Sequence, residues 1–277
     1  NLHDFHPATD AIPVAELPLL DRWMLQRTAE VMDDITEAFE NFEFFRFFQL
    51  LQNFCVTDLS NFYLDIAKDR LYVSAPQDRR RRSCQTVMAL IIERLAGLIA
   101  PVLCHMAEDI WQNLPYPVEE TSVFRRGWPT VPADWRDGAL STPVQQLREL
   151  RAAVNKVLED CRGRQELGAS LEASVRIDAR RPELQAALSW LNEEGDAEVD
   201  GLRDWLLVSQ LQIGGEPWAE LLASQDDDLA LIEVSRARGI KCERCWHYEG
   251  DVGQHPDHPH ICGRCVGVLE RRTHQLA

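Results

Sequence analysis

The 277-residue sequence has no apolar run that could cross a membrane. Its most apolar stretch, residues 87–107, is interrupted by Glu93, Arg94 and Pro101, whereas a spanning helix needs about 20 predominantly apolar residues. A secretory signal is also missing. We therefore expect no membrane partner and interpret residues 87–107 as a buried helix.

Positive charge is scarce as well. The chain has 29 Lys and Arg against 45 Asp and Glu, a formal net charge of −16. Such a surface repels phosphate, which argues against indiscriminate binding of nucleic acid but leaves room for a local basic patch. The exception is residues 236–277, where seven Lys or Arg face five Asp or Glu.

Half of the eight cysteines lie outside any motif. These four are Cys55, Cys84, Cys104 and Cys161, and we interpret them as small buried hydrophobic residues. A chain of this length without a signal does not fit a secreted disulfide framework. The sequence therefore predicts a reducing cytoplasm. Because it begins with Asn1 rather than Met, we also expect a longer parent chain.

Apolar residues recur every three or four positions in three long segments, which predicts amphipathic helices. The segments are 18–40, 43–70 and 78 to about 114. Pro101 should kink or interrupt the third, because proline removes a backbone donor. The aromatic run FEFFRFF at 42–48 is interpreted as packing between helices rather than as base stacking. With a Pro- and Trp-rich covering segment, these helices predict a bundle over residues 1–139.

Residues 140–235 have the pattern of a small α/β unit. Helices are expected over 144–161 and 180–194, and strands near 168–178, 205–213 and 229–234. The acidic run SQDDD at 224–228 is interpreted as a turn. The remaining residues, 236–277, form the third predicted domain.

Two CxxC pairs stand out in this last segment. Cys242 and Cys245 form the first pair, and Cys262 and Cys265 form the second, sixteen residues further on. This spacing is typical of a zinc site in which four thiolates surround one ion tetrahedrally. Four filled positions leave none for water, so the predicted zinc is structural. A redox dithiol pair is the competing interpretation.

Histidines lie between the two pairs and offer a second alternative. His247, His255, His258 and His260 are near enough in sequence for one to replace a cysteine ligand. With four cysteines present no such ligand is required, and we interpret HPDHPH as a solvated loop. The role of His255, His258 and His260 is left open.

The run RLYVSAPQDRRRRSC at 70–84 is a second anomaly. Its arginines begin a helix, where cations oppose the helix dipole. Helix-terminal amides and several Arg together can bind phosphate, and Arg can stack on unpaired bases. A solvated charged face is the competing interpretation.

Several segments resemble class I aminoacyl-tRNA synthetases. LDRWMLQR (20–27), FYLDIAKDRLY (62–72) and RRSCQT (81–86) resemble their anticodon-binding helical bundle. VNKVLED (154–160), GASLEASV (168–175), KCERCWHY (241–248) and ICGRC (261–265) are similar to the C-terminal region of bacterial isoleucyl-tRNA synthetases. The WHY triplet after the first cysteine pair is the most specific of these matches.

The resemblance implies a mainly α fold: a class I synthetase-type anticodon-binding bundle, a small α/β unit and a C-terminal four-Cys zinc module. It implies tRNA binding near the anticodon stem-loop of isoleucine tRNA, with the remainder of the synthetase chain as a further partner and a monomer as the expected state. The family's HIGH and KMSKS signatures are missing here, so ATP would bind only in the absent catalytic domain and no catalytic residue is expected.

The residues nominated as RNA contacts are Arg70, Arg81, Arg82 and Trp246. Trp246 could equally pack against the zinc knuckle. Three other functions stay open at this point: a zinc-dependent protein-interaction module, the same region of a valyl enzyme, and a zinc enzyme or thiol redox protein.

Overall fold

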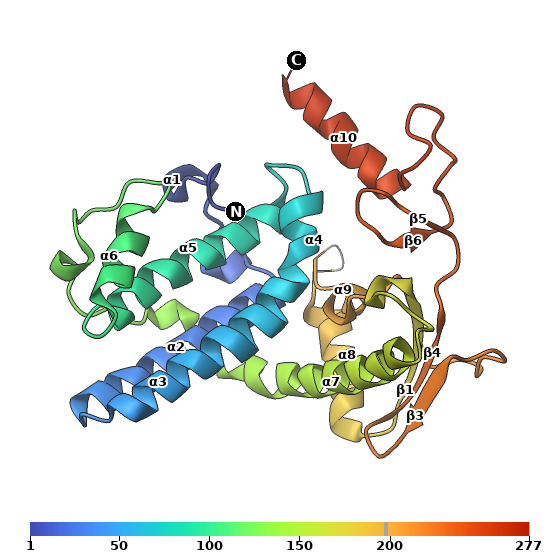
Figure 1. Cartoon of the computed structure of the whole chain (residues 1–277), viewed down its shortest axis with the longest axis horizontal. Helices are drawn as coiled ribbons and strands as arrows, with labels where there is room; N and C mark the ends of the chain where they lie inside the picture. The colour runs from blue at the N-terminus through green and yellow to red at the C-terminus, as the bar shows by residue number, and fades with distance from the viewer. Residues whose placement is uncertain (197–198, 277) are drawn as a thin grey trace. The chain divides into compact units, whose positions relative to one another are not determined.

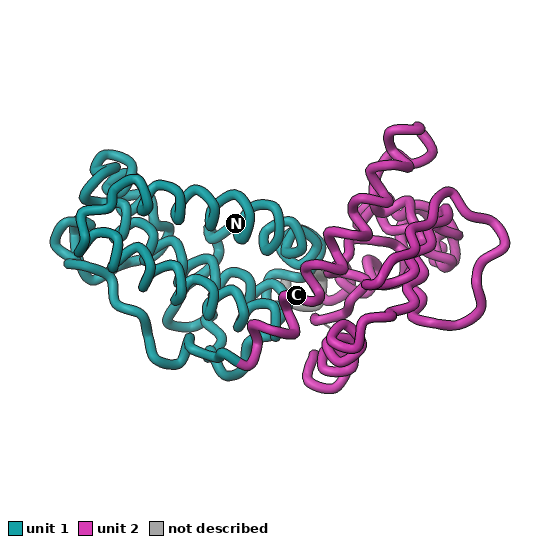
Figure 2. Tube along the Cα trace, turned by 90° about the horizontal axis from the view of Figure 1, so that it is seen from below, with its two compact units in different colours: residues 1–138 teal, residues 139–277 magenta. Residues whose placement is uncertain are grey.

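The chain forms two compact units, Asn1–Gly138 and Ala139–Ala277 (Figure 2). The structure, a computed structural model, describes residues 1–196 and 199–276, with side chains as far as Arg271. The predicted boundary between residues 139 and 140 lies one residue from the division between the units. The second predicted boundary, between residues 235 and 236, lies inside unit 2 and stays a prediction.

Unit 1 is a helical bundle, as the periodicity predicts (Figure 1). Its longer elements are α2 (Leu19–Glu40), α3 (Phe44–Asn53), η2 (Phe54–Leu64), α4 (Asp65–Val73), α5 (Arg79–Ile99) and α6 (Cys104–Gln112). Short pieces precede and follow them: α1 (Pro7–Asp10), η1 (Val14–Glu16), η3 (Val123–Arg125) and η4 (Ala133–Trp135), with η5 (Gly138–Leu140) at the junction. The buried face of α2 carries Leu20, Met24, Val31 and Ile35, so the predicted stripe is confirmed.

The second predicted helix, 43–70, is not α-helical throughout. Its middle part, η2, winds as a π-helix and continues into α4, which ends at Val73. Phe54, Asp58 and Phe62, which are spaced four residues apart, are buried on this stretch. Arg27 of α2 donates to Asp58 at 2.9 Å, so the Asp58 carboxylate is paired with a cation.

Pro101 interrupts the third helix as expected. Asp78 caps the start of α5 by accepting from the Arg80 amide at 2.9 Å, and α5 ends at Ile99 before α6 begins at Cys104. Of the residues whose structure is described, no helix has both the length and the apolar composition that a membrane crossing requires.

Unit 2 is built on a four-stranded sheet with the order β2-β1-β4-β3. Its strands are β1 (Ala173–Ala179), β2 (Gln210–Ile213), β3 (Ala223–Asp226) and β4 (Ala230–Arg236), and its helical elements are α7 (Ser141–Gly163), η6 (Ser170–Glu172), α8 (Pro182–Glu194) and α9 (Leu202–Leu206). β1 and β2 run parallel because α8 and α9 connect them, whereas β4 lies antiparallel to β1 and β3. α7 packs on α8 and on the sheet. The core between them includes Val154 and Leu158 of α7, Val175 of β1 and Val234 of β4.

Two predictions in unit 2 were wrong in part. The strand expected over 205–213 is confined to β2, because Trp205 and Leu206 close α9 and Leu207 adopts a left-handed φ of 55°. The acidic run at 224–228 is only partly a turn, since Ser224 and Asp226 belong to the edge strand β3. The turn itself centres on Asp227, whose carboxylate accepts from the amides of Leu229 and Ala230 at 2.9 and 3.1 Å.

Candidate metal centre

The four cysteines of the two CxxC pairs converge on one point, and all four sulfur atoms lie within 4.8 Å of one another. Cys242 Sγ lies 3.8 Å from Cys265 Sγ, and Cys245 Sγ lies 3.7 Å from Cys262 Sγ. Zn–S bonds of about 2.3 Å in a tetrahedron place sulfurs about 3.8 Å apart. The residues present therefore fit zinc, and the predicted ligand set is brought together as a buried cluster.

Backbone hydrogen bonds shape the first cysteine pair into a knuckle. It follows β5 (Ile240–Lys241), which pairs with β6 (Tyr248–Glu249). The Cys242 amide donates to His247 O at 2.8 Å, and the Trp246 amide donates to Cys242 O at 2.9 Å. This tight loop aims both thiols inward.

The second pair sits at the start of α10 (Gly263–Leu276). The Cys262 amide donates to Cys242 Sγ at 3.3 Å, which joins the two knuckles. Gly263 donates its amide to Asp251 at 2.9 Å, and a Cβ on Gly263 would lie 2.7 Å from the same carboxylate oxygen. Only glycine tolerates that approach without displacing Asp251.

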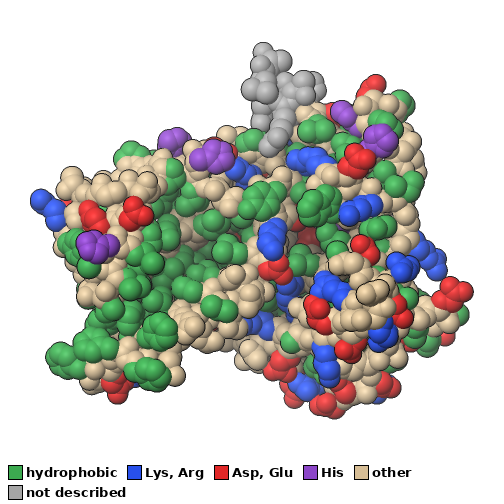
Figure 3. Space-filling view, in the orientation of Figure 1, with side chains coloured by type: hydrophobic (Ala, Val, Ile, Leu, Met, Phe, Trp, Pro, Cys, Tyr) green, Lys and Arg blue, Asp and Glu red, His purple; other side chains and the backbone are tan. Residues whose placement is uncertain are grey.

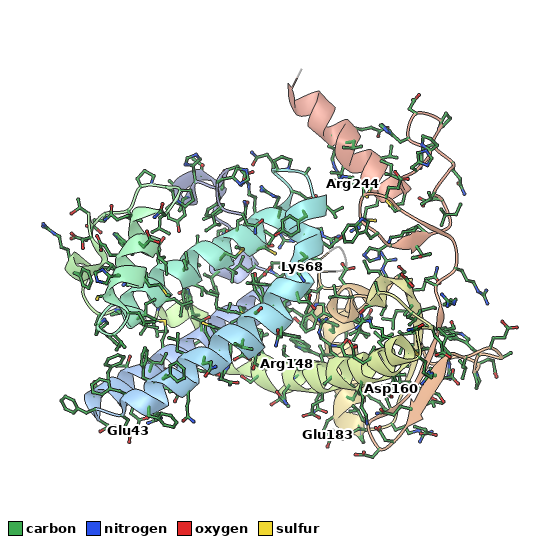
Figure 4. All side chains as sticks on the ribbon, viewed as in Figure 1. Glu43, Lys68, Arg148, Asp160, Glu183 and Arg244 are labelled. Carbon is green, nitrogen blue, oxygen red and sulfur yellow. The ribbon has the colours of Figure 1, made fainter. Side chains whose placement is uncertain are left out.

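Neighbouring donors favour the thiolate form of Cys262. Hydrogen bonds from the thiols of Cys245 and Cys265 lower the pKa of Cys262 to about 3, whereas the contacts with Cys245 and Cys262 raise the pKa of Cys265; Arg244, which donates to Cys265 Sγ at 3.7 Å, opposes that rise. Four thiolates on Zn²⁺ would carry a net charge of −2, which the Arg244 guanidinium (labelled in Figure 4) partly offsets. With four sulfur ligands no position is left for water, so the zinc builds structure rather than activating a nucleophile.

The zinc module is fastened to the sheet of unit 2. The Tyr248 amide donates to Ser209 Oγ at 2.8 Å. Arg203 of α9 pairs with Glu249 at 3.2 Å, and Gln210 exchanges hydrogen bonds of 2.7 and 3.0 Å with the backbone of Arg238. These contacts hold the module against β2 and the end of α9.

Trp246 is presented to solvent rather than packed. Its side chain is 62% exposed, and its backbone has a left-handed φ of 67°, a conformation that is costly for a bulky L-residue. The Lys241 ammonium lies 5.7 Å from the ring centroid. The knuckle therefore displays an aromatic ring beside a cation.

Two further cations, Arg236 and Arg238, lie just before the knuckle. The sequence pattern alone does not select them as site residues. Arg236 and Arg238 are exposed, and within the described part of the chain neither guanidinium has an acidic partner. The excess of positive charge in residues 236–277 was the available signal. That excess does not indicate which of the cations have no acidic partner among the described residues.

The histidines take no part in the cluster. His247 is buried, His255 and His258 are half-buried, and His260 is exposed and faces Glu243 at 3.9 Å. Among the described residues, the cysteines alone make up the group that could hold a metal ion.

The structure buries the three arginines of the basic run that were nominated as RNA contacts, whereas Arg79 in the same run is exposed. Arg70 is 1% exposed, Arg81 7% and Arg82 6%. Arg81 makes two hydrogen bonds to the Asp4 carboxylate, at 2.6 and 2.9 Å, and Arg82 donates to the Asp4 carbonyl at 2.8 Å. Their role as RNA contacts stays a prediction. In the structure each of them hydrogen-bonds to an acidic residue earlier in the chain, either Asp21 or Asp4.

Comparisons with known proteins agree with this geometry. Residues 21–177 match the family described as "Anticodon-binding domain of tRNA ligase", and residues 239–267 match "Zinc finger found in FPG and IleRS". The chain is 88% identical over 276 residues, all of its length, to the isoleucine–tRNA ligase of Parasynechococcus marenigrum (strain WH8102). It is 76% identical over 272 residues, 98% of its length, to those of Synechococcus sp. (strain CC9311) and Prochlorococcus marinus (strain MIT 9313).

In each case the chain spans 28% of the relative's length. The zinc-finger match and the four-sulfur cluster together support one structural zinc ion on Cys242, Cys245, Cys262 and Cys265. The chain belongs to the anticodon-binding domain family of the tRNA ligases and corresponds to the C-terminal region of the bacterial isoleucyl members.

Proposed function

We propose that this chain is the tRNA-holding part of an isoleucine–tRNA ligase, which grips the anticodon stem-loop region of isoleucine tRNA while the rest of the enzyme joins isoleucine to that tRNA with ATP. The activity belongs to the longer chain, and the 277 residues alone should be inactive in aminoacylation. We expect this part to act in the cytoplasm and as a monomer.

The observation that carries the proposal is the exposed ring of Trp246 on a zinc-fixed knuckle. This tryptophan has a left-handed backbone conformation, and its side chain is exposed rather than packed in a hydrophobic core. An exposed aromatic face of this kind can stack on an unpaired base. The zinc site supports this role because it fixes the loop from which the ring projects.

Cations around the ring supply the second part of the interaction. Lys241 lies at the ring, and Arg236 and Arg238 precede it with no acidic partner among the described residues. Phosphate contacts from such residues position RNA without reading its sequence. Arg70, Arg81 and Arg82 would contribute less directly, by holding the bundle together, since they are buried.

The test is a fluorescence-anisotropy titration of zinc-loaded protein with isoleucine tRNA and with an unrelated tRNA at low salt. We expect the protein to prefer isoleucine tRNA. We also expect the affinity to fall as salt rises, because protein cations that contact phosphates displace counterions from the RNA. Trp246→Ala should weaken binding about tenfold, since stacking on one base contributes about 1–3 kcal/mol. Arg236→Glu with Arg238→Glu should weaken all tRNA binding and flatten the salt dependence.

Arg180→Glu is the matched control, because Arg180 is 47% exposed and lies outside both matched segments, residues 21–177 and 239–267. Equal affinity for both tRNAs would overturn the proposal. A zinc-dependent protein-interaction module would then be the remaining candidate.

A further inference from the structure

Unit 1 leaves part of an apolar helix stripe open to solvent. Phe44, Phe48 and Leu51 of α3 follow one another at intervals of four and three residues, which is the spacing of a buried helix face. In the structure Phe44 is 52% exposed and Phe48 55% exposed, and Leu51 is half-buried. The same stripe is fully covered further on, at Phe62 and Ile66.

A second stripe on α5 is uncovered in the same way. In the first half of α5, Cys84 and Met88 pack with Ala67 and Leu71 of α4. Ile92 and Leu95 continue the Met88 face by four and seven residues, yet both are only half-buried. Beyond the end of α5, Val102 is 48% exposed. α4 therefore covers this side of α5 as far as Met88, and the second half of the helix remains more open.

Figure 3 shows hydrophobic side chains gathered over unit 1, from the end where α2 turns into α3 across toward α5 and α6. We call the two open stripes of α3 and α5 together the apolar face and define it by Phe44, Phe48, Leu51, Ile92, Leu95 and Val102. A contiguous exposed apolar area of this kind marks an interaction site in most soluble proteins.

The rim of the apolar face is acidic. Residues 33–48 hold five carboxylates, and two arginines pair with some of them: Arg46 with Glu37 at 2.7 Å and with Glu43 at 3.1 Å, and Arg136 with Asp33 at 2.7 Å. Glu43, labelled in Figure 4, marks this end of the bundle. The charge selects an occupant that is apolar on one side and basic at its edge.

We propose that the apolar face is covered by an amphipathic helix with a basic flank, supplied by the part of the synthetase chain outside these 277 residues. The inference rests on the proposed function. It is supported by length, because the relatives carry 72% of their chain beyond the matched 28%, and by the helical spacing of both open stripes, which one further helix would complete.

Two other occupants fit the charge less well. RNA would bring phosphates against a rim on which carboxylates outnumber cations. A second copy of the same face would bring two acidic rims together.

Cys104 allows a direct test, because it is an exposed thiol beside Val102 at the end of the apolar face. In a Cys55→Ser background, maleimide should label Cys104 rapidly in the 277-residue chain. We expect labelling to be at least tenfold slower in the complete synthetase carrying this region. Ala186→Cys, on an exposed position of α8 in unit 2, is the matched control and should react at the same rate in both proteins.

Phe48→Glu provides the second variant. It should restore Cys104 labelling in the complete synthetase and leave the melting temperature of the 277-residue chain unchanged, because Phe48 is already exposed there. Equal Cys104 rates in both proteins would overturn the inference, as would protection that requires added tRNA or that rises with protein concentration. The labelling test involves no tRNA. A complete enzyme that prefers isoleucine tRNA but leaves Cys104 reactive would therefore overturn this inference and leave the proposed function intact.

Discussion

Asp21 and Arg70 form an ion pair in the interior of the helical bundle, with 2.9 Å between Asp21 Oδ2 and Arg70 Nη1. Neither side chain is more than 1% exposed. Tyr63 donates to the other carboxylate oxygen at 2.5 Å, and burial together with the Asp21 charge raises the pKa of Tyr63 well above its ordinary value, so the phenol remains a donor. The network joins α2, η2 and α4.

The first prediction concerns this pair. Arg70→Met should lower the free energy of unfolding by about 3–5 kcal/mol, because it leaves the Asp21 carboxylate buried without its cation. Urea denaturation measures the change. Lys68→Met is the control, since exposed Lys68 pairs with Asp65 on the same helix and should lose less than about 0.5 kcal/mol. A loss as small as that of the control would contradict the structural role of Arg70.

The second prediction concerns pH and Asp4. Hydrogen bonds from Arg81, opposed by burial and aided by Gln85, hold the pKa of Asp4 well below its ordinary value of 3.8. A carboxylate with a lowered pKa contributes stability above the unfolded value, and the contribution is lost as pH falls through the folded pKa. Asp4→Asn should therefore cost about 2 kcal/mol at pH 7, and its difference from the unmodified chain should shrink below pH 3.8.

Thermal unfolding at several pH values checks that difference. Asp33→Asn serves as the comparison, because Asp33 and Arg136 are about half exposed and such pairs contribute little. A cost of Asp4→Asn that stays constant down to the lowest pH tested would argue against an ionised Asp4.

The third prediction concerns zinc. Purified chain should contain one zinc ion, and a chelator should unfold residues 240–265 while unit 1 and the four-stranded sheet keep their structure, because metal binding supplies about 10 kcal/mol or more of the module's folding free energy. Metal analysis and hydrogen exchange test this. Cys245→Ser should lose the metal, and Cys161→Ser, a buried cysteine outside the cluster, should keep it. Zinc-free protein that cycles between thiols and disulfides would support the redox interpretation.

The fourth prediction separates the ring of Trp246 from its backbone. Trp246→Gly should be more stable than Trp246→Ala by about 1 kcal/mol, because glycine adopts the left-handed conformation without a Cβ penalty. Both variants should bind isoleucine tRNA equally weakly if the ring is the contact. Melting temperature and the tRNA titration together test this, and a glycine variant that binds normally would exclude stacking.

The local sequence pattern was sufficient to predict those parts of the structure that depend on neighbouring residues. The 3.6-residue period placed α2, α5 and α7 because each needs one apolar side, and Pro101 ended α5 because a missing amide acts on its own turn. The cysteine spacing identified the zinc ligands for a similar reason, since two CxxC turns can close on one ion wherever the connecting chain runs.

Distant contacts decided the rest. The sequence by itself determined a helical bundle, a small α/β unit and a four-cysteine zinc site in an acidic chain. The tertiary structure alone decided that Arg70, Arg81 and Arg82 of the basic run are buried, because Asp4 and Asp21 approach them from far along the chain. It also decided which hydrophobic stripes remain open, because burial depends on which helices meet, and no periodicity within one helix specifies its neighbour.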